Sequence, residues 1–221
     1  MQKRIPVIDI FAGPGGLGEG FESFRVSKSF RPFKVCLSIE KDIYAHRTLE
    51  LRSFFRKFEK TKIPKEYYEY LQGRRSREDL FSKYSSQAEK AALEAWHAKL
   101  GKTSDQEVDD RIEEAIDFNE NWVLIGGPPC QGYSVIGRAR NSENPNYCLR
   151  EDKRQTFYVK YLKVLADHHP AVTIMENVKG LLVTTLENQR IFEGILYDLR
   201  APCESILRVL RFLMGVLCYA Y

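Results

Sequence analysis

A short apolar run followed by a glycine-rich turn constrains the fold more than any other part of this chain. Residues 5–11 suit a central β-strand and lead directly into Gly13-Pro14-Gly15-Gly16-Leu17-Gly18. The turn satisfies G-x-G-x-x-G at a strand-to-helix junction. There, glycine lets a ligand approach the backbone, and the new helix offers unpaired N–H groups. Glycine-rich turns also occur for structural reasons alone, so the pattern by itself predicts only an α/β fold with a parallel sheet.

A second predicted strand, Lys34–Ile39, ends at Glu40. This carboxylate follows the last glycine of the turn by about 20 residues, the spacing at which an acid reaches a ribose hydroxyl pair. Alone, Glu40 is an ordinary surface glutamate. Together with the turn, it favours a cofactor that contains adenosine. The pattern does not choose among such cofactors, and a nicotinamide cofactor stays open.

Two later strands are expected to end in residues capable of catalysis. Trp122–Ile125 runs into Gly126-Gly127-Pro128-Pro129-Cys130-Gln131, and Ala171–Met175 ends at Glu176. Glycines and prolines stop the first of these strands and form a rigid loop. Because parallel strands place ligands at their carboxyl ends, Cys130 and Glu176 are expected to face one crevice. The alternative for Cys130 is a free, packed thiol.

A long charged segment separates the second strand from the cysteine loop. Its pattern is helical over residues 43–116, and we expect a helical insertion at about residues 52–118. The polar run at residues 137–155 is either a solvated connection or a lid that contacts phosphates. Further helices are predicted at residues 156–168 and 190–199.

The composition limits the class of protein. The chain has 221 residues, a net charge of +4 and five cysteines without a C-x-x-C pair, and no signal-peptide pattern. These features favour one cytosolic domain with reduced thiols. The longest apolar run, residues 212–221, is far shorter than the roughly 20 residues that span a bilayer. His168 and His169 have no metal-ligand spacing to a second cluster, so we expect neither a membrane nor a metal.

The three motifs together resemble those of the DNA (cytosine-5) methyltransferases. The resemblance rests on Asp9–Gly16, Gly127–Gln131 and Glu176–Val178, in the family's order. It implies a Rossmann-like methyltransferase sheet with S-adenosylmethionine as cofactor and with Glu40 on the ribose. The cofactor-binding residues that it implies are Phe11, Gly13, Gly16, Glu40, Lys41, Pro129 and Phe157. The family's acid on the third strand, which reads the adenine amine, is not placed, because the charged segment obscures that strand.

The resemblance also implies a covalent mechanism on double-stranded DNA. Carbon 5 of cytosine is a poor nucleophile, so Cys130 as thiolate would add to carbon 6. Glu176 would hold the ring nitrogen and the exocyclic amine as charge develops. The base must leave the stacked duplex to reach these groups. The expected protein is a methylase of a bacterial restriction–modification system.

The sequence also departs from the family's pattern. Strands carrying a catalytic arginine, a target-recognition domain and a final helix have no counterpart before Tyr221. We therefore expect residues 1–221 to be a partial catalytic domain, inactive alone, that needs a missing carboxyl-terminal half or a second chain. The alternatives are a transfer-RNA cytosine-5 methyltransferase, a non-catalytic fragment or subunit of a split methylase and, more distantly, a nicotinamide dehydrogenase.

Overall fold

A five-stranded parallel sheet forms the centre of the molecule. The computed structural model describes residues 3–27, 30–128, 155–183, 185–186 and 189–206. The strand order is β3-β2-β1-β4-β5, and each neighbouring pair is parallel. The strands are β1 (Ile5–Ile10), β2 (Phe33–Glu40), β3 (Ala95–His97), β4 (Val123–Gly126) and β5 (Val172–Met175). The predicted α/β class with a parallel sheet is therefore confirmed.

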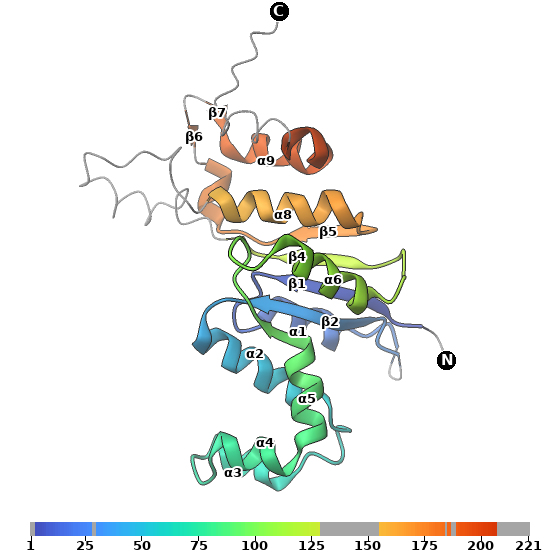
Figure 1. Cartoon of the computed structure of the whole chain (residues 1–221), viewed down its shortest axis with the longest axis vertical. Helices are drawn as coiled ribbons and strands as arrows, with labels where there is room; N and C mark the ends of the chain where they lie inside the picture. The colour runs from blue at the N-terminus through green and yellow to red at the C-terminus, as the bar shows by residue number, and fades with distance from the viewer. Residues whose placement is uncertain (1–2, 28–29, 129–154, 184, 187–188, 207–221) are drawn as a thin grey trace, which may run out of the picture.

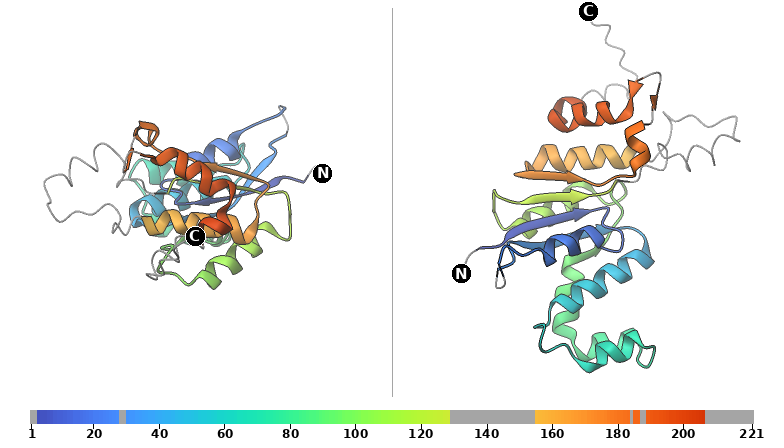
Figure 2. Two further views of the ribbon diagram at one scale, coloured as in Figure 1. Left: turned by 90° about the horizontal axis from the view of Figure 1, so that it is seen from above. Right: turned by 180° about the vertical axis from the view of Figure 1, so that it is seen from behind.

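Helices cover both faces of this sheet. They are α1 (Gly16–Ser23), α2 (Ile43–Arg56), α3 (Lys65–Leu71), α4 (Arg77–Lys83), α5 (Ser85–Glu94), α6 (Asp105–Ile116), α8 (Gln155–His168) and α9 (Ile191–Arg200). A short 3-10 helix, η2 (Lys179–Val183), and a hairpin of β6 (Thr185–Leu186) and β7 (Gln189–Arg190) follow β5. Figures 1 and 2 show α6 and α8 on one face of the sheet and α1 on the other.

The alternation of side chains along the strands divides the core into two layers. On the face of α6 and α8, buried strand residues such as Ile8 and Ile10 pack with Ile112 and Tyr161. On the face of α1, the buried residues Val7, Val35, Val123 and Ile125 pack with Leu17 and Phe21. Both faces of the central strands are thus apolar, which explains why residues 5–10 and 123–126 are almost continuously hydrophobic.

The charged segment contains a strand that its sequence pattern did not predict. Ala95–His97 forms β3, whose residues pair in parallel with Ser38–Glu40 of β2. Of these three residues only Trp96 favours a strand, and they follow directly on α5, so local preference gives little strand signal. The purely helical interpretation of residues 52–118 is therefore wrong at β3. That about residues 52–118 form an insertion stays a prediction.

Helices α2 to α5 extend from the sheet edge at β3, at the bottom of Figure 1. They have a small core of their own, in which Phe54, Leu80 and Ala91 are fully buried. The rings of Phe54 and Phe81 stack with centroids 4.6 Å apart. None of the helices that the structure describes is long and apolar enough to cross a membrane.

Candidate active site

The glycines of the first turn have two different surroundings. A Cβ atom at Gly15 would lie 2.6 Å from a methyl carbon of Leu49 in α2, and Gly15 has a φ of +84°. Gly18 is also tightly packed against the protein, with a side-chain oxygen 3.0 Å from where its Cβ would be. At Gly13 and Gly16, by contrast, no described atom lies within 4 Å of that position. Gly13 and Gly16, the two glycines predicted to bind the cofactor, therefore face open space.

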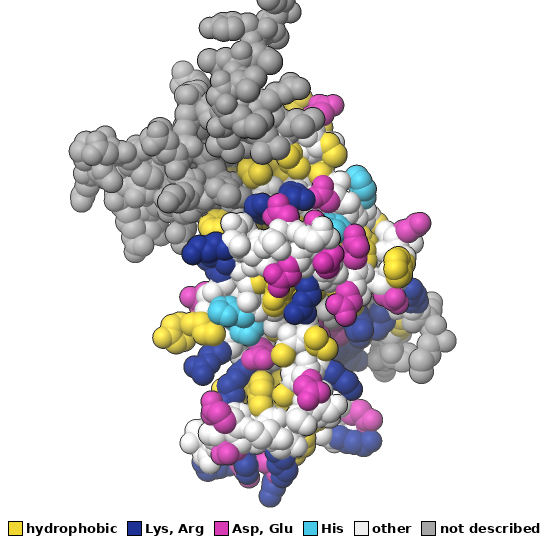
Figure 3. Space-filling model, viewed as in Figure 1, with side chains coloured by type: hydrophobic (Ala, Val, Ile, Leu, Met, Phe, Trp, Pro, Cys, Tyr) yellow, Lys and Arg dark blue, Asp and Glu magenta, His cyan; other side chains and the backbone are white. Residues whose placement is uncertain are grey.

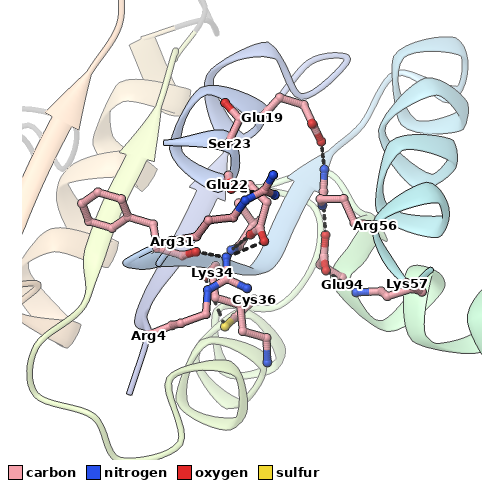
Figure 4. A network of polar contacts seen from close by, with 12 residues as sticks. Arg4, Glu19, Glu22, Ser23, Arg31, Lys34, Cys36, Arg56, Lys57 and Glu94 are labelled. Atoms are coloured by element: carbon pink, nitrogen blue, oxygen red, sulfur yellow. Dashed lines mark hydrogen bonds and ion pairs between the residues drawn. The ribbon is translucent and has the colours of Figure 1, made fainter. Parts of the chain in front are cut away.

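Ion pairs hold the helix that follows the turn (Figure 4). Arg56 of α2 contacts both Glu19 of α1 and Glu94 of α5, and Glu94 also contacts Lys57. Burial opposes ionisation of Glu94, but the charges of Arg56 and Lys57 outweigh it and keep the pKa of this carboxyl below its ordinary value. Next to this network, Glu22 of α1 accepts a hydrogen bond from the Val35 N–H, 2.8 Å away. These contacts fix α1 against β2 and α2.

Glu40 lies where β2 ends and bonds directly to the glycine turn. Its Oε2 accepts a hydrogen bond from the Gly13 N–H at 2.8 Å, and its Oε1 accepts one from the Asp42 N–H at 2.7 Å. The side chain is 9% exposed. Each carboxylate oxygen can accept a second hydrogen bond, so Glu40 can hold the turn and bind two hydroxyl groups together.

Two aromatic rings and a lysine gather beside Glu40. Phe11 has a φ of +59°, which is unusual outside glycine, and its ring meets the ring of Phe157 edge-on with centroids 5.9 Å apart. The Nζ atom of Lys41 lies 4.5 Å from the centroid of the Phe157 ring. A partly open cavity of about 160 Å³ lies here and is lined by Phe11, Ile39, Glu40, Lys41, Ala98, Leu100, Gly127 and Phe157. Four of the predicted cofactor-binding residues thus share one pocket.

Glu176 lies next to this pocket across the ends of two strands. Its backbone N–H donates to the carbonyl oxygen of Gly126 at 2.9 Å, which extends the pairing of β4 with β5 by one residue. A Cβ atom at Gly127 would lie 3.0 Å from Oε2 of Glu176. Since Gly127 also lines the pocket, this glycine is the direct link between the pocket and the predicted catalytic acid.

The remaining predicted residues, Pro129 and Cys130, lie outside the described residues, as does the polar run up to residue 154. The last described residue before this gap is Pro128, two residues beyond the end of β4. In the part of the chain that the structure describes, no group of three or more His, Cys, Asp or Glu side chains is placed to hold a metal ion.

A second, larger cavity of about 450 Å³ lies elsewhere, between the amino-terminal half of β2 and helices α5 and α6. It contains Cys36, the pKa of whose thiol is raised by burial, and none of the predicted site residues. A raised pKa disfavours the reactive thiolate. The smaller pocket, where predicted residues meet, is therefore the better candidate site.

Ala98 and Leu100, which form the pocket wall on the side of β3, were not predicted from any sequence pattern. The main-chain N–H of Ala98 donates to the carbonyl oxygen of Glu40 at 3.1 Å, so the chain that leaves β3 stays beside the end of β2. Only the recognition of β3 could have identified these residues. Between the end of β3 and Leu100 lie Ala98 and Lys99, and neither is an acid that could bind the adenine amine.

Comparison with known proteins identifies the family. A model of the C-5 cytosine-specific DNA methylases matches residues 77–201, more than half of the chain. The chain belongs to this family. The family match begins in α4 and includes β3, β4, β5 and the predicted catalytic residues Cys130 and Glu176. It confirms the resemblance drawn from the motifs.

Individual proteins that match this chain are named as methyltransferases. Type II methyltransferase M.Bpa9945I of Bacillus paralicheniformis is 28% identical over 206 residues, which are 86% of this chain and 43% of the relative. M.BspRI of Lysinibacillus sphaericus is 25% identical over 198 residues, covering 90% of this chain and 38% of the relative. The structure of the Entamoeba histolytica methyltransferase EhMeth aligns with 16% identity and a TM-score of 0.43, over 90% of this chain and 43% of that one. The chain thus spans less than half the length of these proteins.

Proposed function

We propose that this protein transfers a methyl group from S-adenosylmethionine to carbon 5 of cytosine in double-stranded DNA, as part of a restriction–modification methylase. The observation that carries the proposal is the meeting of Phe11, Glu40, Lys41 and Phe157 around one pocket, with Glu176 beside it. Membership of the C-5 cytosine-specific family supports the reaction type. The names of the relatives, type II methyltransferases, support the kind of enzyme system.

The residues of the pocket suit S-adenosylmethionine. Glu40 has free acceptor capacity for the ribose hydroxyls, and the apolar wall of Ile39, Ala98 and Leu100 suits the adenine ring. At about 160 Å³ the cavity is smaller than the roughly 300–1,000 Å³ of a whole ligand site, so it would hold the adenosine part. The methionine part would lie across the open faces of Gly13 and Gly16. Phe157 and Pro129 would close over it. The bound cofactor would supply an electrophilic methyl group.

The chemical steps fall to Cys130 and Glu176. The Cys130 thiolate would form a bond to carbon 6 of cytosine, which breaks the aromaticity of the ring and makes carbon 5 nucleophilic. Glu176 would bind the ring nitrogen and the exocyclic amine, and so stabilise the charge of the adduct. Once carbon 5 has taken the methyl group and S-adenosylhomocysteine has been released, a base would remove the proton of carbon 5, and the electron pair would expel the Cys130 thiolate. Cys130 is thereby restored.

The target base would have to leave the DNA duplex, because carbon 6 is inaccessible within the stack. Glu176 is an exposed side chain in this structure, so a flipped base could reach it without displacing part of the core. The arginines and lysine of residues 138–154 would then contact phosphates around the open site.

Trapping with DNA that contains 5-fluorocytosine tests the covalent route. Fluorine replaces the proton that must leave, so the adduct between Cys130 and carbon 6 persists and is detected by denaturing electrophoresis. We expect an adduct with the wild-type chain in the presence of S-adenosylmethionine and none with Cys130→Ala. Cofactor binding, measured by calorimetry, should be the same in both. The assay is run with and without a carboxyl-terminal fragment of a relative that supplies the target-recognition part.

Other outcomes would point to other functions. Methyl transfer to transfer RNA but not to DNA would indicate the RNA-directed alternative. Cofactor binding without an adduct under any of these conditions would indicate a non-catalytic fragment or subunit. Binding of NAD in place of S-adenosylmethionine would refute the assignment of the pocket.

A further inference from the structure

A group of exposed cations borders the candidate site on the side of β2 and β3. Lys41 follows β2, Arg47 lies on the second turn of α2, and Lys99 and Lys102 follow β3; all four are exposed. We call these four residues the basic rim. Residues 41–48 and 97–104 contain these four cations and a single acid, Asp42. Asp42 caps α2, where its Oδ1 accepts hydrogen bonds from the N–H groups of residues 44 and 45.

Hydrogen bonds bring the two segments of the basic rim together. Glu40 pairs with His97 at the ends of β2 and β3, and the His97 ring donates from Nε2 to the carbonyl oxygen of Lys41 at 2.9 Å. The N–H of Lys102 donates to the carbonyl oxygen of Lys99 at 2.9 Å, so both lysines belong to one tight turn. In Figure 3, Lys and Arg side chains (dark blue) and His side chains (cyan) lie close together on the left of the molecule, near the start of α2.

The charges of the basic rim are not balanced within the described part of the chain. None of its four cations forms an ion pair there, whereas nearby Arg77 pairs with Glu50 and stacks on Phe81. Tyr44, which lies between Lys41 and Arg47 at the start of α2, is 76% exposed. Exposed cations without matching acids, next to a hydroxyl-bearing aromatic ring, are the residue types that contact phosphates.

The basic rim also lies at the carboxyl ends of the strands, where the catalytic residues are expected. Lys41 covers the Phe157 ring, and Ala98 and Leu100, on either side of Lys99, line the pocket. The carboxyl ends of β4 and β5, which lead to Cys130 and Glu176, lie on this same side of the sheet. A DNA duplex whose base enters the site between β4 and β5 would therefore extend over the carboxyl ends of the strands toward β2 and β3.

We propose that the basic rim binds the phosphate backbone of the DNA on the β3 side of the target base. The proposal rests on the proposed function, since it takes double-stranded DNA as the substrate. Such contacts hold and orient the duplex without reading its sequence. They also release counterions, so binding through the rim weakens as the salt concentration rises.

A charge-neutral variant of the rim tests this surface. The triple variant Arg47→Gln, Lys99→Gln, Lys102→Gln leaves Lys41 in place, because Lys41 belongs to the cofactor pocket. The control is Lys34→Gln, Lys60→Gln, Lys90→Gln, which removes three exposed lysines on β2, after α2 and on α5, away from this edge. Binding of a fluorescent duplex of mixed sequence is measured by anisotropy at several NaCl concentrations. Calorimetry with S-adenosylmethionine checks that the pocket is intact.

Loss of three phosphate contacts should reduce the slope of log K against log salt by about 2–3, and should weaken binding at 0.1 M salt by at least about tenfold. The control should change the slope by less than about 1. Equal slopes for the wild type and the rim variant, or an equal loss in the control, would overturn the proposal. If the wild type forms the 5-fluorocytosine adduct while the rim variant keeps the wild-type slope, only the rim is wrong. If neither adduct nor DNA binding occurs, the proposed function fails as well.

Discussion

Replacing Asp9 with asparagine should change how the stability of the protein depends on pH. Asp9 lies on the central strand β1, is 1% exposed, and is packed against Gly18 of α1. Its Oδ2 has no hydrogen-bond partner among the described residues. Burial raises the pKa of Asp9 from 3.8 to about 7. The Gly18 N–H and the charge of Arg56 lower it, and the charge of Glu40 raises it.

The expected size of the effect follows from this pKa difference. The unfolded chain releases the Asp9 proton near pH 3.8, whereas the folded protein holds it until about pH 7. Between these values the folded state binds more protons, so stability falls as pH rises. The gap of about 3 pH units, at about 1.4 kcal/mol each, corresponds to about 4 kcal/mol. About 2 kcal/mol of this is lost between about pH 5 and pH 7, and the loss becomes constant above about pH 8.

Urea unfolding of the wild type and Asp9→Asn at pH values from about 5 to 8.5 measures this effect. Asparagine has no proton to release, so the free energy of unfolding of the variant should rise relative to that of the wild type by about 2 kcal/mol from pH 5 to pH 7. A constant offset between the two proteins is uninformative, because the buried amide has its own hydrogen-bond cost. A difference that does not vary with pH would refute the argument, since Asp9 would then be ionised in the folded state throughout.

Three further outcomes are expected from the site. Gly126→Ala would place a Cβ atom 2.2 Å from the carbonyl oxygen of Ile10, so its free energy of unfolding, measured by chemical denaturation, should fall by about 3 kcal/mol. In the control Gly20→Ala, the new Cβ atom lies in open space within α1, and the free energy of unfolding should rise by about 0.5–1 kcal/mol. Equal effects of the two alanines would contradict the packing of β4 against β1. Glu40→Gln would present an amide NH₂ to one of two N–H donors that now bond to the carboxylate, and calorimetry should show at least about tenfold weaker binding of S-adenosylmethionine. Unchanged affinity would remove Glu40 from the ribose site. Phe157→Ala removes the contact with Phe11 and the ring beneath Lys41, so it should weaken cofactor binding by about tenfold. Phe157→Leu keeps a large apolar side chain and should weaken binding less. A Leu variant that binds as weakly as the Ala variant would show that the size of this side chain does not matter.

Most of the candidate site could be predicted because its residues follow strands directly. Phe11, Glu40 and Glu176 each come within one residue of the end of β1, β2 or β5, and parallel strands bring those ends to one edge. Phe157 was predicted only through the family resemblance. Its place beside Phe11 depends on how α8 packs on the sheet, which no local pattern specifies.

The wall of the pocket on the side of β3 was beyond local prediction. Ala98 and Leu100 belong to a chain segment whose course is set by the pairing of Ala95–His97 with β2. A strand of three residues buries little on its own and has no periodicity to detect. It exists because the edge of β2 offers partners for its backbone.

The first turn separates what the sequence determined from what only the tertiary structure decided. The sequence alone determined that the chain must turn sharply after β1, because glycines at this spacing permit backbone angles that other residues avoid. It did not determine which glycines serve the fold and which face a ligand. That was decided by Leu49 of α2, which fills the space at Gly15, while the space at Gly13 and Gly16 stays open. Backbone freedom is a local property of the residue, but occupied space depends on segments that are distant in the sequence.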